Sequence, residues 1–315
     1  MRKKNFKINL VIIGAGNMAN EYLKVARTFK EINIFGIYSR TYKKALKLKN
    51  KYKINKIYKS LSEIKKCKIC DILIVCVSAE NNEKIYKFFL KSKLNILAEK
   101  PISLDFKSSK QIIDKSKKLK SKIFVALNRR YFDSNIYLKK IIKKMKGKRI
   151  LEVFDCQNKN RYEKLGHNKK VINSLMYANS IHLIDYFNML CRGKVKRIVK
   201  MKFSRKIPIV IAKIMYSSGD IGIYYANWNR HLKWKIKLTV NEKIEFVLQP
   251  LETIKAYKIS NNKLILSKSF PSKYKDGLKN MLQDLIYNFY NKNNDLISLN
   301  KHFTTIKLIK DIYGK

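Results

Sequence analysis

A buried strand, a glycine turn and an amphipathic helix follow one another directly at the start of this chain. The apolar run from Ile8 to Ile13 is long enough for one strand, and Gly14 and Gly16 precede the amphipathic segment Tyr22 to Phe29. Gly14 permits a sharp turn, while Gly16 has no Cβ and lets the backbone approach a pyrophosphate at a helix N-terminus. Ala19 occupies the last small position of the pattern G-x-G-x-x-G/A. A strand-to-helix turn without any ligand is the alternative. The pattern predicts a dinucleotide site formed by Gly14, Gly16, Asn17 and Met18.

The residues after the second expected strand, Ile32 to Tyr38, bear on which dinucleotide would bind. A site for NAD usually has an acidic residue about 20 positions past the glycines, where it binds the ribose hydroxyls. Here Ser39, Arg40 and Thr41 offer a guanidinium and two hydroxyls but no carboxylate. These groups suit a 2′-phosphate, so the sequence favours NADP over NAD. A solvated surface charge is the alternative reading of Arg40.

Three further buried strands are expected in the first part of the chain, each preceded by a helical segment. They run from Asp71 to Val77, from Asn95 to Ala98 and from Ile123 to Leu127. Strands that alternate with helices of this length form a parallel, doubly wound sheet. Ser78 follows one of these strands at the carboxyl edge, where open α/β sheets bind their ligands.

The pattern changes near residue 128. Beyond it, short strand-like segments are separated by turns such as Ser217 to Asp220, which indicates hairpins and a mainly antiparallel sheet. Two closing helices, Asp276 to Tyr290 and Leu299 to Tyr313, are expected to pack on that sheet. The fold class is therefore α/β, with a dinucleotide-binding domain at 1–127 and an α+β domain with a large, mostly antiparallel sheet at 128–315.

The formal net charge of +49 raises the question of a nucleic-acid or membrane partner. Only eleven of the 71 basic residues are arginine, and the lysines are spread along the whole chain. A protein that grips phosphates specifically favours arginine and clusters its charge. We therefore expect no specific nucleic-acid partner and no membrane partner.

The cysteines and histidines predict neither a disulfide framework nor a metal site. Five cysteines without framework spacing are typical of a reducing compartment, and a cytoplasmic protein is expected. Cys67 and Cys70 have C-x-x-C spacing but no second pair beside them. His167, His231 and His302 form no cluster with cysteines or carboxylates, so no metal is expected.

Several motifs in this order resemble one family. They are the glycine turn, Ser-Arg-Thr after the second strand, Glu99-Lys100-Pro101, Asn128-Arg129-Arg130-Tyr131 and His182-x-x-Asp185. Together they resemble the glucose–fructose oxidoreductase, inositol dehydrogenase and rhizopine-catabolism family, written Gfo/Idh/MocA, over nearly the full length. The resemblance implies a Rossmann domain, an NAD(P) cofactor and an oxidoreductase acting on CH–OH groups.

The resemblance also implies roles for particular side chains. Lys100 would reach the nicotinamide ribose and the substrate hydroxyl, with Glu99 beside the cofactor, and the bond before Pro101 is often cis in relatives. His182 would act as acid or base, because an imidazole titrates near neutral pH. The family's aspartate four residues before the histidine is replaced by Ala178, so Asp185, one turn on, is an alternative orienting group. A buried structural histidine is the competing interpretation.

The pairing of residues 126–132 with residues 177–186 resembles a branch of the family found among genes for surface sugars and flagellar glycans, which implies a sugar or nucleotide-sugar substrate. Members of the family commonly associate through the open face of the second sheet, so the resemblance also implies a homo-oligomer. Arg129 or Arg130 would lie near the substrate, and the sequence does not decide between them; Trp228 and Arg230 are further candidates. A non-catalytic NAD(P)-binding regulator or scaffold is the alternative function. The substrate-binding residues implied are Arg130, Tyr131, Tyr177, Asn179 and Asp185.

Overall fold

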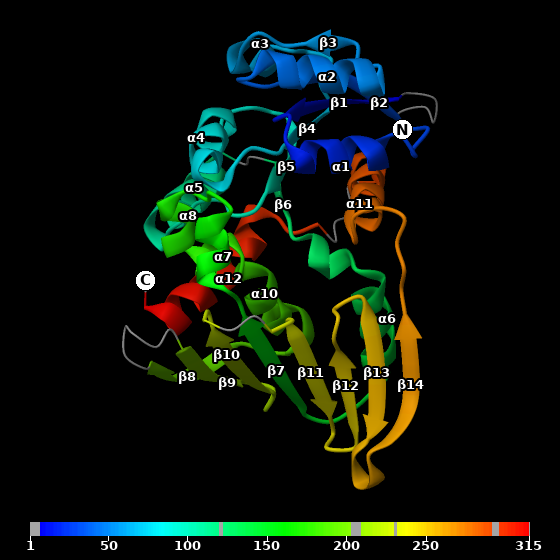
Figure 1. Ribbon diagram of the computed structural model, residues 1–315, viewed down its shortest axis with the longest axis vertical. Helices are drawn as coiled ribbons and strands as arrows, with labels where there is room; N and C mark the ends of the chain where they lie inside the picture. The colour runs from blue at the N-terminus through cyan, green and yellow to red at the C-terminus, as the bar shows by residue number, and fades with distance from the viewer. Residues whose placement is uncertain (1–6, 120–121, 203–208, 230–231, 292–295, 315) are drawn as a thin grey trace. The chain divides into compact units, whose positions relative to one another are not determined.

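A computed structural model describes residues 7–119, 122–202, 209–229, 232–291 and 296–314 (Figure 1). Its contacts divide the chain into two compact units. The first comprises Met1–Asn128 and Lys273–Phe303, and the second comprises Arg129–Ser272 and Thr304–Lys315. Across the described ranges, no helix combines the length and the apolar character needed to cross a membrane.

The first unit contains a six-stranded sheet in the order β3-β2-β1-β4-β5-β6, and all its neighbouring strands are parallel. Runs of Ile, Leu and Val explain this, since strands covered on both faces read as continuous apolar segments. Every residue of β4 and β6 is buried. The predicted parallel, doubly wound sheet is therefore confirmed. Its strands are β1 (Ile8–Ile13), β2 (Ile32–Tyr38), β3 (Lys56–Ile57), β4 (Ile72–Val75), β5 (Asn95–Glu99) and β6 (Ile123–Ala126).

Helices between these strands make the crossovers. The first helix begins at Asn17, directly at the glycine turn and five residues before the predicted amphipathic segment. The amphipathic pattern started later in the sequence because Asn17 and Asn20 give the first turn of the helix a polar surface. They are α1 (Asn17–Ala26), α2 (Tyr42–Tyr52), α3 (Leu61–Lys65), α4 (Ala79–Phe89) and α5 (Phe106–Lys118).

The closing helices differ from expectation. Helix α11 (Leu278–Asn291) belongs to the first unit and packs against α1, with Met281, Leu282 and Leu285 in its buried face. Helix α12 (Leu299–Tyr313) begins in the first unit and ends in the second. The contact-based units change after residue 128, and residues 273–303 belong to the first unit. An amphipathic pattern identifies a buried face without saying which surface covers it.

The second unit contains an eight-stranded sheet in the order β14-β13-β12-β11-β7-β10-β9-β8. Only the β7–β10 pair is parallel among these described strands, so the predicted, mostly antiparallel character is confirmed. Strand β13 was not predicted. The strands are β7 (Arg149–Cys156), β8 (Val195–Lys202), β9 (Ile209–Tyr216), β10 (Ile221–Asn227), β11 (Lys235–Val240), β12 (Ile244–Leu248), β13 (Thr253–Lys258) and β14 (Lys263–Ser269).

Helix α10 of this unit lies against β7 (Figure 1). A Cβ on Gly222 of β10 would come within 2.7 Å of the Phe187 ring, so glycine is needed where the helix packs on the sheet. The buried Arg149 guanidinium donates to the carbonyls of Ile142 and Leu190, near the ends of two helices. The helical segments are η1 (Asn128–Tyr131), α6 (Asp133–Lys143), α7 (Lys159–Lys164), α8 (Lys169–Asn173), α9 (Leu175–Ala178), α10 (Ile181–Leu190) and η2 (Ile259–Asn261).

Candidate functional site

The two glycines of the opening turn have different physical roles. Gly14 has φ +112°, and a Cβ built on it would lie 2.2 Å from the carbonyl oxygen of Cys76. Its N–H donates to the Tyr38 carbonyl at 2.7 Å, so this residue joins the ends of three strands. Gly16 is exposed, and a Cβ there would meet no atom within 4 Å. Gly14 is therefore required by the fold, whereas Gly16 leaves open space.

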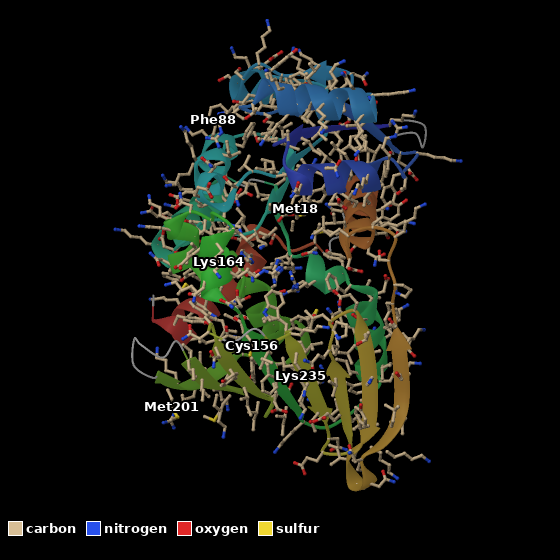
Figure 2. The ribbon with its side chains drawn as sticks, in the orientation of Figure 1. Met18, Phe88, Cys156, Lys164, Met201 and Lys235 are labelled. Atoms are coloured by element: carbon tan, nitrogen blue, oxygen red, sulfur yellow. The ribbon has the colours of Figure 1, made fainter. Side chains whose placement is uncertain are left out.

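The open space beside Gly16 lies at the start of α1. Gly16 is the N-cap residue, with no side-chain cap, and the first turn carries no acidic residue. The first N–H groups of a helix lack intrahelical partners, and the helix dipole makes this end positive. Met18, labelled in Figure 2, is in the same turn. This geometry fits a phosphate of a dinucleotide held against bare backbone.

The ends of the neighbouring strands carry the other predicted cofactor residues. Ser39 and Arg40 follow β2; the Ser39 hydroxyl accepts the Thr41 N–H at 3.2 Å, and Arg40 is exposed. Ser78 caps α4 after β4, is exposed and accepts a hydrogen bond from Asn81 Nδ2 at 2.7 Å. Because parallel strands present their carboxyl ends to one edge, all these groups share the edge where such sheets bind ligands.

Lys100 follows β5 at the same edge and is half-buried. The Lys100–Pro101 peptide bond is cis. Two side chains of α4 hold the backbone on both sides of the lysine. Tyr86 Oη donates to the Glu99 carbonyl at 2.6 Å, and Asn82 Nδ2 donates to the Pro101 carbonyl at 2.8 Å. The main chain that carries the ammonium is therefore fixed before any ligand binds.

The Glu99 side chain points into the first unit. Tyr22 Oη of α1 donates to Glu99 Oε1 at 2.7 Å, which joins the first helix to the fifth strand. Burial raises the pKa of this carboxyl, while the Lys100 charge and the Tyr22 hydrogen bond act in the opposite direction. What Glu99 offers a cofactor is thus its main chain, since its carboxyl is occupied inside.

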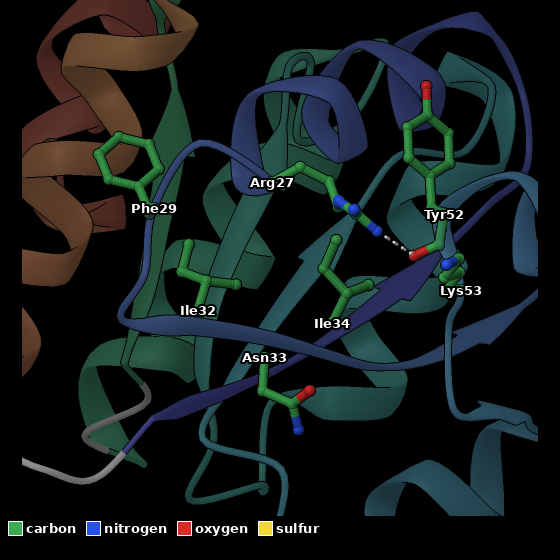
Figure 3. A pocket seen from close by; sticks show the side chains of 7 residues that line it. All are labelled: Arg27, Phe29, Ile32, Asn33, Ile34, Tyr52 and Lys53. Atoms are coloured by element: carbon green, nitrogen blue, oxygen red, sulfur yellow. Dashed lines mark hydrogen bonds between the residues drawn. The ribbon is translucent and has the colours of Figure 1, made fainter.

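A separate small cavity of about 190 Å³ lies at the other end of β2 (Figure 3). Arg27 Nη1 donates to the Tyr52 carbonyl at 3.0 Å within it. Its walls include the first residues of β2, whereas the cofactor residues follow the last residue of that strand, so it is not part of the candidate site. Its lining is Arg27, Phe29, Ile32, Asn33, Ile34, Tyr52 and Lys53.

His182, in the first turn of α10, is buried in the second unit, and its backbone N–H donates to the Asn179 carbonyl at 3.2 Å. Asp185, suggested as an orienting group for His182, also has other partners. Both its carboxylate oxygens accept from Arg130, at 2.5 Å from Nε and 2.7 Å from Nη2, and Thr305 Oγ1 donates at 2.8 Å. The aspartate forms a buried ion pair that ties η1 and α12 to α10.

That ion pair separates the two adjacent arginines. Arg130 is committed to Asp185, whereas the centre of the Arg129 guanidinium lies over the Trp234 ring, 4.5 Å from its centroid. Tyr131 and Tyr177, predicted as substrate ligands, are buried in the second unit. Of the predicted set, Asn179 is the one that keeps a partly exposed polar side chain without a charged partner.

Asn179 belongs to a hydrogen-bonded cluster that sequence reasoning missed. Its Nδ2 donates to Gln157 Oε1 at 2.8 Å and to Tyr162 Oη at 2.7 Å, and Tyr162 Oη donates to Gln157 at 3.1 Å. Gln157 Nε2 in turn donates to buried Asp155 at 2.7 Å, whose other oxygen accepts from Tyr224. Burial raises the pKa of Asp155. The one available signal was that Gln157 comes directly after Cys156, the last residue of β7.

The remaining candidates are Trp228, Arg230 and the cysteines. Trp228 stacks on Tyr313 with ring centroids 5.5 Å apart, and Arg230 lies outside the described residues. All five cysteines are free, and burial raises the pKa of Cys70 to about 12, which opposes thiolate chemistry at the C-x-x-C pair. Among the described residues, no three or more His, Cys, Asp or Glu side chains come together in a group able to hold a metal ion.

The sequence matches to known proteins lie in the first unit. Residues 8–127 match the model of an oxidoreductase family with an NAD-binding Rossmann fold, GFO_IDH_MocA. A myo-inositol 2-dehydrogenase from Thermotoga maritima is 25% identical over 124 residues. That match covers 39% of this chain and 37% of the relative's length.

Solved structures resemble both units. A dehydrogenase from Chromobacterium violaceum superposes with a TM-score of 0.83 at 15% identity, covering 98% of this chain and 95% of that one. A UDP-N-acetylglucosamine 3-dehydrogenase from Acidithiobacillus ferrooxidans gives 0.76 at 10% identity, covering 98% and 97%. GenD2 from gentamicin A biosynthesis, solved in complex with NAD, gives 0.75 at 12%, covering 99% and 95%. These likenesses establish the fold, and the match to the oxidoreductase family model with an NAD-binding Rossmann fold is confined to residues 8–127.

Proposed function

We propose that the protein is an NAD(P)-dependent oxidoreductase that moves a hydride between a nicotinamide cofactor and a carbinol or keto carbon of a sugar or nucleotide-sugar. The observation that carries this is the open space beside Gly16 at the uncapped start of α1, on the same sheet edge as Lys100. The family match over 8–127 supports the cofactor. The sugar-acting relatives support the substrate class.

The proposed site residues of the first unit have distinct tasks. Backbone around Gly16, Asn17 and Met18 would hold the pyrophosphate, while Ser39 and Arg40 would hold the ribose end. A bound nicotinamide would supply the hydride acceptor or donor. Since Arg40 is exposed and no carboxylate stands beside it, we infer a preference for NADP over NAD. Ser78 and the main chain of Glu99 would line the remainder of the cofactor site.

The proposed chemistry uses the ammonium of Lys100 and the imidazole of His182. The Lys100 ammonium would donate a hydrogen bond to the reacting oxygen and stabilise the negative charge that develops there. When the carbinol is oxidised, His182 would take the hydroxyl proton while the hydride leaves the same carbon. In the reductive direction His182 would return that proton. Since Asp185 is paired with Arg130, the Ala178 replacement leaves this proton transfer without the family's aspartate.

Two measurements test this proposal. NADPH and NADH fluorescence titrations of the purified protein should give a micromolar or tighter dissociation constant for at least one cofactor. Lys100→Met should then abolish hydride transfer to a sugar-nucleotide panel while cofactor affinity is kept, and Lys107→Met, an exposed lysine on α5, should change neither. Full activity in the Lys100 variant would overturn the role given to its ammonium.

The second candidate function is a cofactor-binding regulator or scaffold without turnover. Ala178, in place of the family's aspartate, is the observation that favours it. Tight cofactor binding without hydride exchange on UDP-N-acetylglucosamine, UDP-glucuronate or myo-inositol would support it over catalysis.

We also infer that a second copy of this chain covers the open face of the second sheet. Val195, Val199 and Met201 of β8 are 42%, 45% and 58% exposed, which is unusual for large apolar side chains on one strand. Light scattering should report a dimer or larger assembly. A monomer at micromolar concentration would contradict this inference.

A further inference from the structure

Arg129 is held in an unusual environment for a charged side chain. The centre of its guanidinium lies 4.5 Å from the centroid of the Trp234 ring and 5.9 Å from that of Phe132. Its carbonyl accepts from Asn135 Nδ2 at 2.7 Å, so the backbone of this residue is fixed by α6. The side chain is mostly buried, and Nε has no hydrogen-bond partner.

Comparison with the neighbouring Arg130 shows which contact Arg129 lacks. Arg130 forms a two-point pair with Asp185, but within the part of the chain that the structure describes Arg129 forms no ion pair. Burial lowers the pKa of Arg129 to about 10. Glu252 and Asp155, with the hydroxyls of Tyr162 and Tyr186, face it at longer range and offset only part of that cost.

A guanidinium taken out of water without an anion beside it is costly, and the cost falls when an anion completes the pair. Stacking on an aromatic face leaves the N–H edge of the guanidinium able to form two parallel bonds with a carboxylate or phosphate. Trp234 therefore orients the cation while contributing no anion of its own.

We propose that Arg129 binds an acidic group of the substrate, a carboxylate or a phosphate, and selects acidic sugars over neutral ones. This inference rests on the proposed function, because it assigns the class of substrate for that function. The Arg129 charge is felt at Tyr162, whose hydroxyl lies in the Asn179–Gln157 cluster. That cluster offers amide and hydroxyl groups for sugar hydroxyls, and the carbonyl of its Asn179 accepts from the His182 backbone N–H.

Calorimetry on the full-length protein tests the proposal without any need for turnover. The probes are UDP, D-glucuronate, UDP-glucuronate and N-acetylglucosamine, at about 0.15 M salt so that loosely held surface charge is screened. The variants are Arg129→Gln and Arg129→Lys. The control is Arg161→Gln, which removes an equal charge from an exposed position on α7.

We expect Arg129→Gln to weaken UDP-glucuronate binding at least 30-fold, Arg129→Lys to restore part of it, and Arg161→Gln to leave it unchanged. Loss for glucuronate but not UDP identifies the carboxylate as the bound group; loss for UDP but not glucuronate identifies the phosphate. Unaltered affinity of Arg129→Gln for every acidic probe would overturn the proposal, as would weakening confined to NADPH.

A folding defect is controlled by the melting temperature. It should not fall in Arg129→Gln, since a buried charge without its counter-ion is removed. The outcomes also separate this proposal from the proposed function. Absent hydride transfer in the wild-type protein contradicts the enzyme, whereas arginine-independent binding of the acidic probes contradicts only the role of Arg129.

Discussion

The substitutions Gly14→Ala and Gly16→Ala should have different effects. The first should reduce the stability of the fold, and the second should reduce cofactor affinity. At Gly14 the backbone has φ +112°, and the added Cβ would lie 2.2 Å from the Cys76 carbonyl oxygen. A residue other than glycine forced into such a conformation costs about 1–3 kcal/mol. The clash must also move β1 away from the end of β4, so a total near 3 kcal/mol is expected.

At Gly16 the same substitution meets no atom within 4 Å, and φ is −89°. Loss of glycine at an N-cap costs no more than about 1 kcal/mol. A methyl group would nevertheless occupy the space assigned to a phosphate. We expect cofactor affinity to fall at least tenfold, which corresponds to about 1.4 kcal/mol.

The assay pairs differential scanning fluorimetry with NADPH titration of each variant. Gly14→Ala should lower the melting temperature by roughly 6–12 °C, at about 2–4 °C per kcal/mol. Gly16→Ala should melt close to the wild-type protein but bind NADPH weakly. Wild-type affinity in Gly16→Ala would refute the phosphate site, and wild-type melting of Gly14→Ala would refute the steric argument.

Two further predictions concern buried carboxyls. Burial raises the pKa of Glu99 above its ordinary value of 4.5, so as pH rises past that value the unfolded chain ionises first and the wild-type protein loses stability. In urea denaturation, the free energy of unfolding of Glu99→Gln should therefore rise relative to that of the wild-type protein between pH 4 and pH 7. A difference in unfolding free energy that stays constant over this range would contradict the prediction. Asp185→Asn should cost about 3–5 kcal/mol, because the buried Arg130 loses its counter-ion. Asp114→Asn, which breaks an exposed pair with Lys110, should cost under about 0.5 kcal/mol in the same assay, and equal effects would count against the argument from burial.

The parts of the fold that the sequence predicted well are those with strong local patterns. Strand β4 is a continuous apolar run and β1 is apolar except for Asn9, and the structure buries the apolar residues of both strands as expected. Strand β13 was missed because Lys255 and Lys258 interrupt its pattern and small Ala256 is one of its buried residues. The attachment of α11 to α1 could not be read from its own amphipathic face, since that contact joins segments some 250 residues apart.

Some residues of the candidate site could likewise be proposed from the local sequence, and others could not. Gly16 and Lys100 stand at fixed places after buried strands, so motif spacing alone is enough to propose them as site residues. The choice between Arg129 and Arg130 depended on Asp185 and Trp234, which lie far along the chain and leave no signal in the local sequence. The cluster likewise joins Asn179 to Gln157 and Tyr162, which precede it by 22 and 17 residues.

The chain passes from one unit to the other after residues 128, 272 and 303. During synthesis on the ribosome, the dinucleotide-binding half would therefore wait for α11 until the whole second sheet has been made. A fragment ending at residue 127 would leave the α11-facing side of α1 bare and prone to aggregation. Dissection of this protein for expression or for domain exchange should accordingly keep 273–303 joined to the amino-terminal piece, for example by circular permutation.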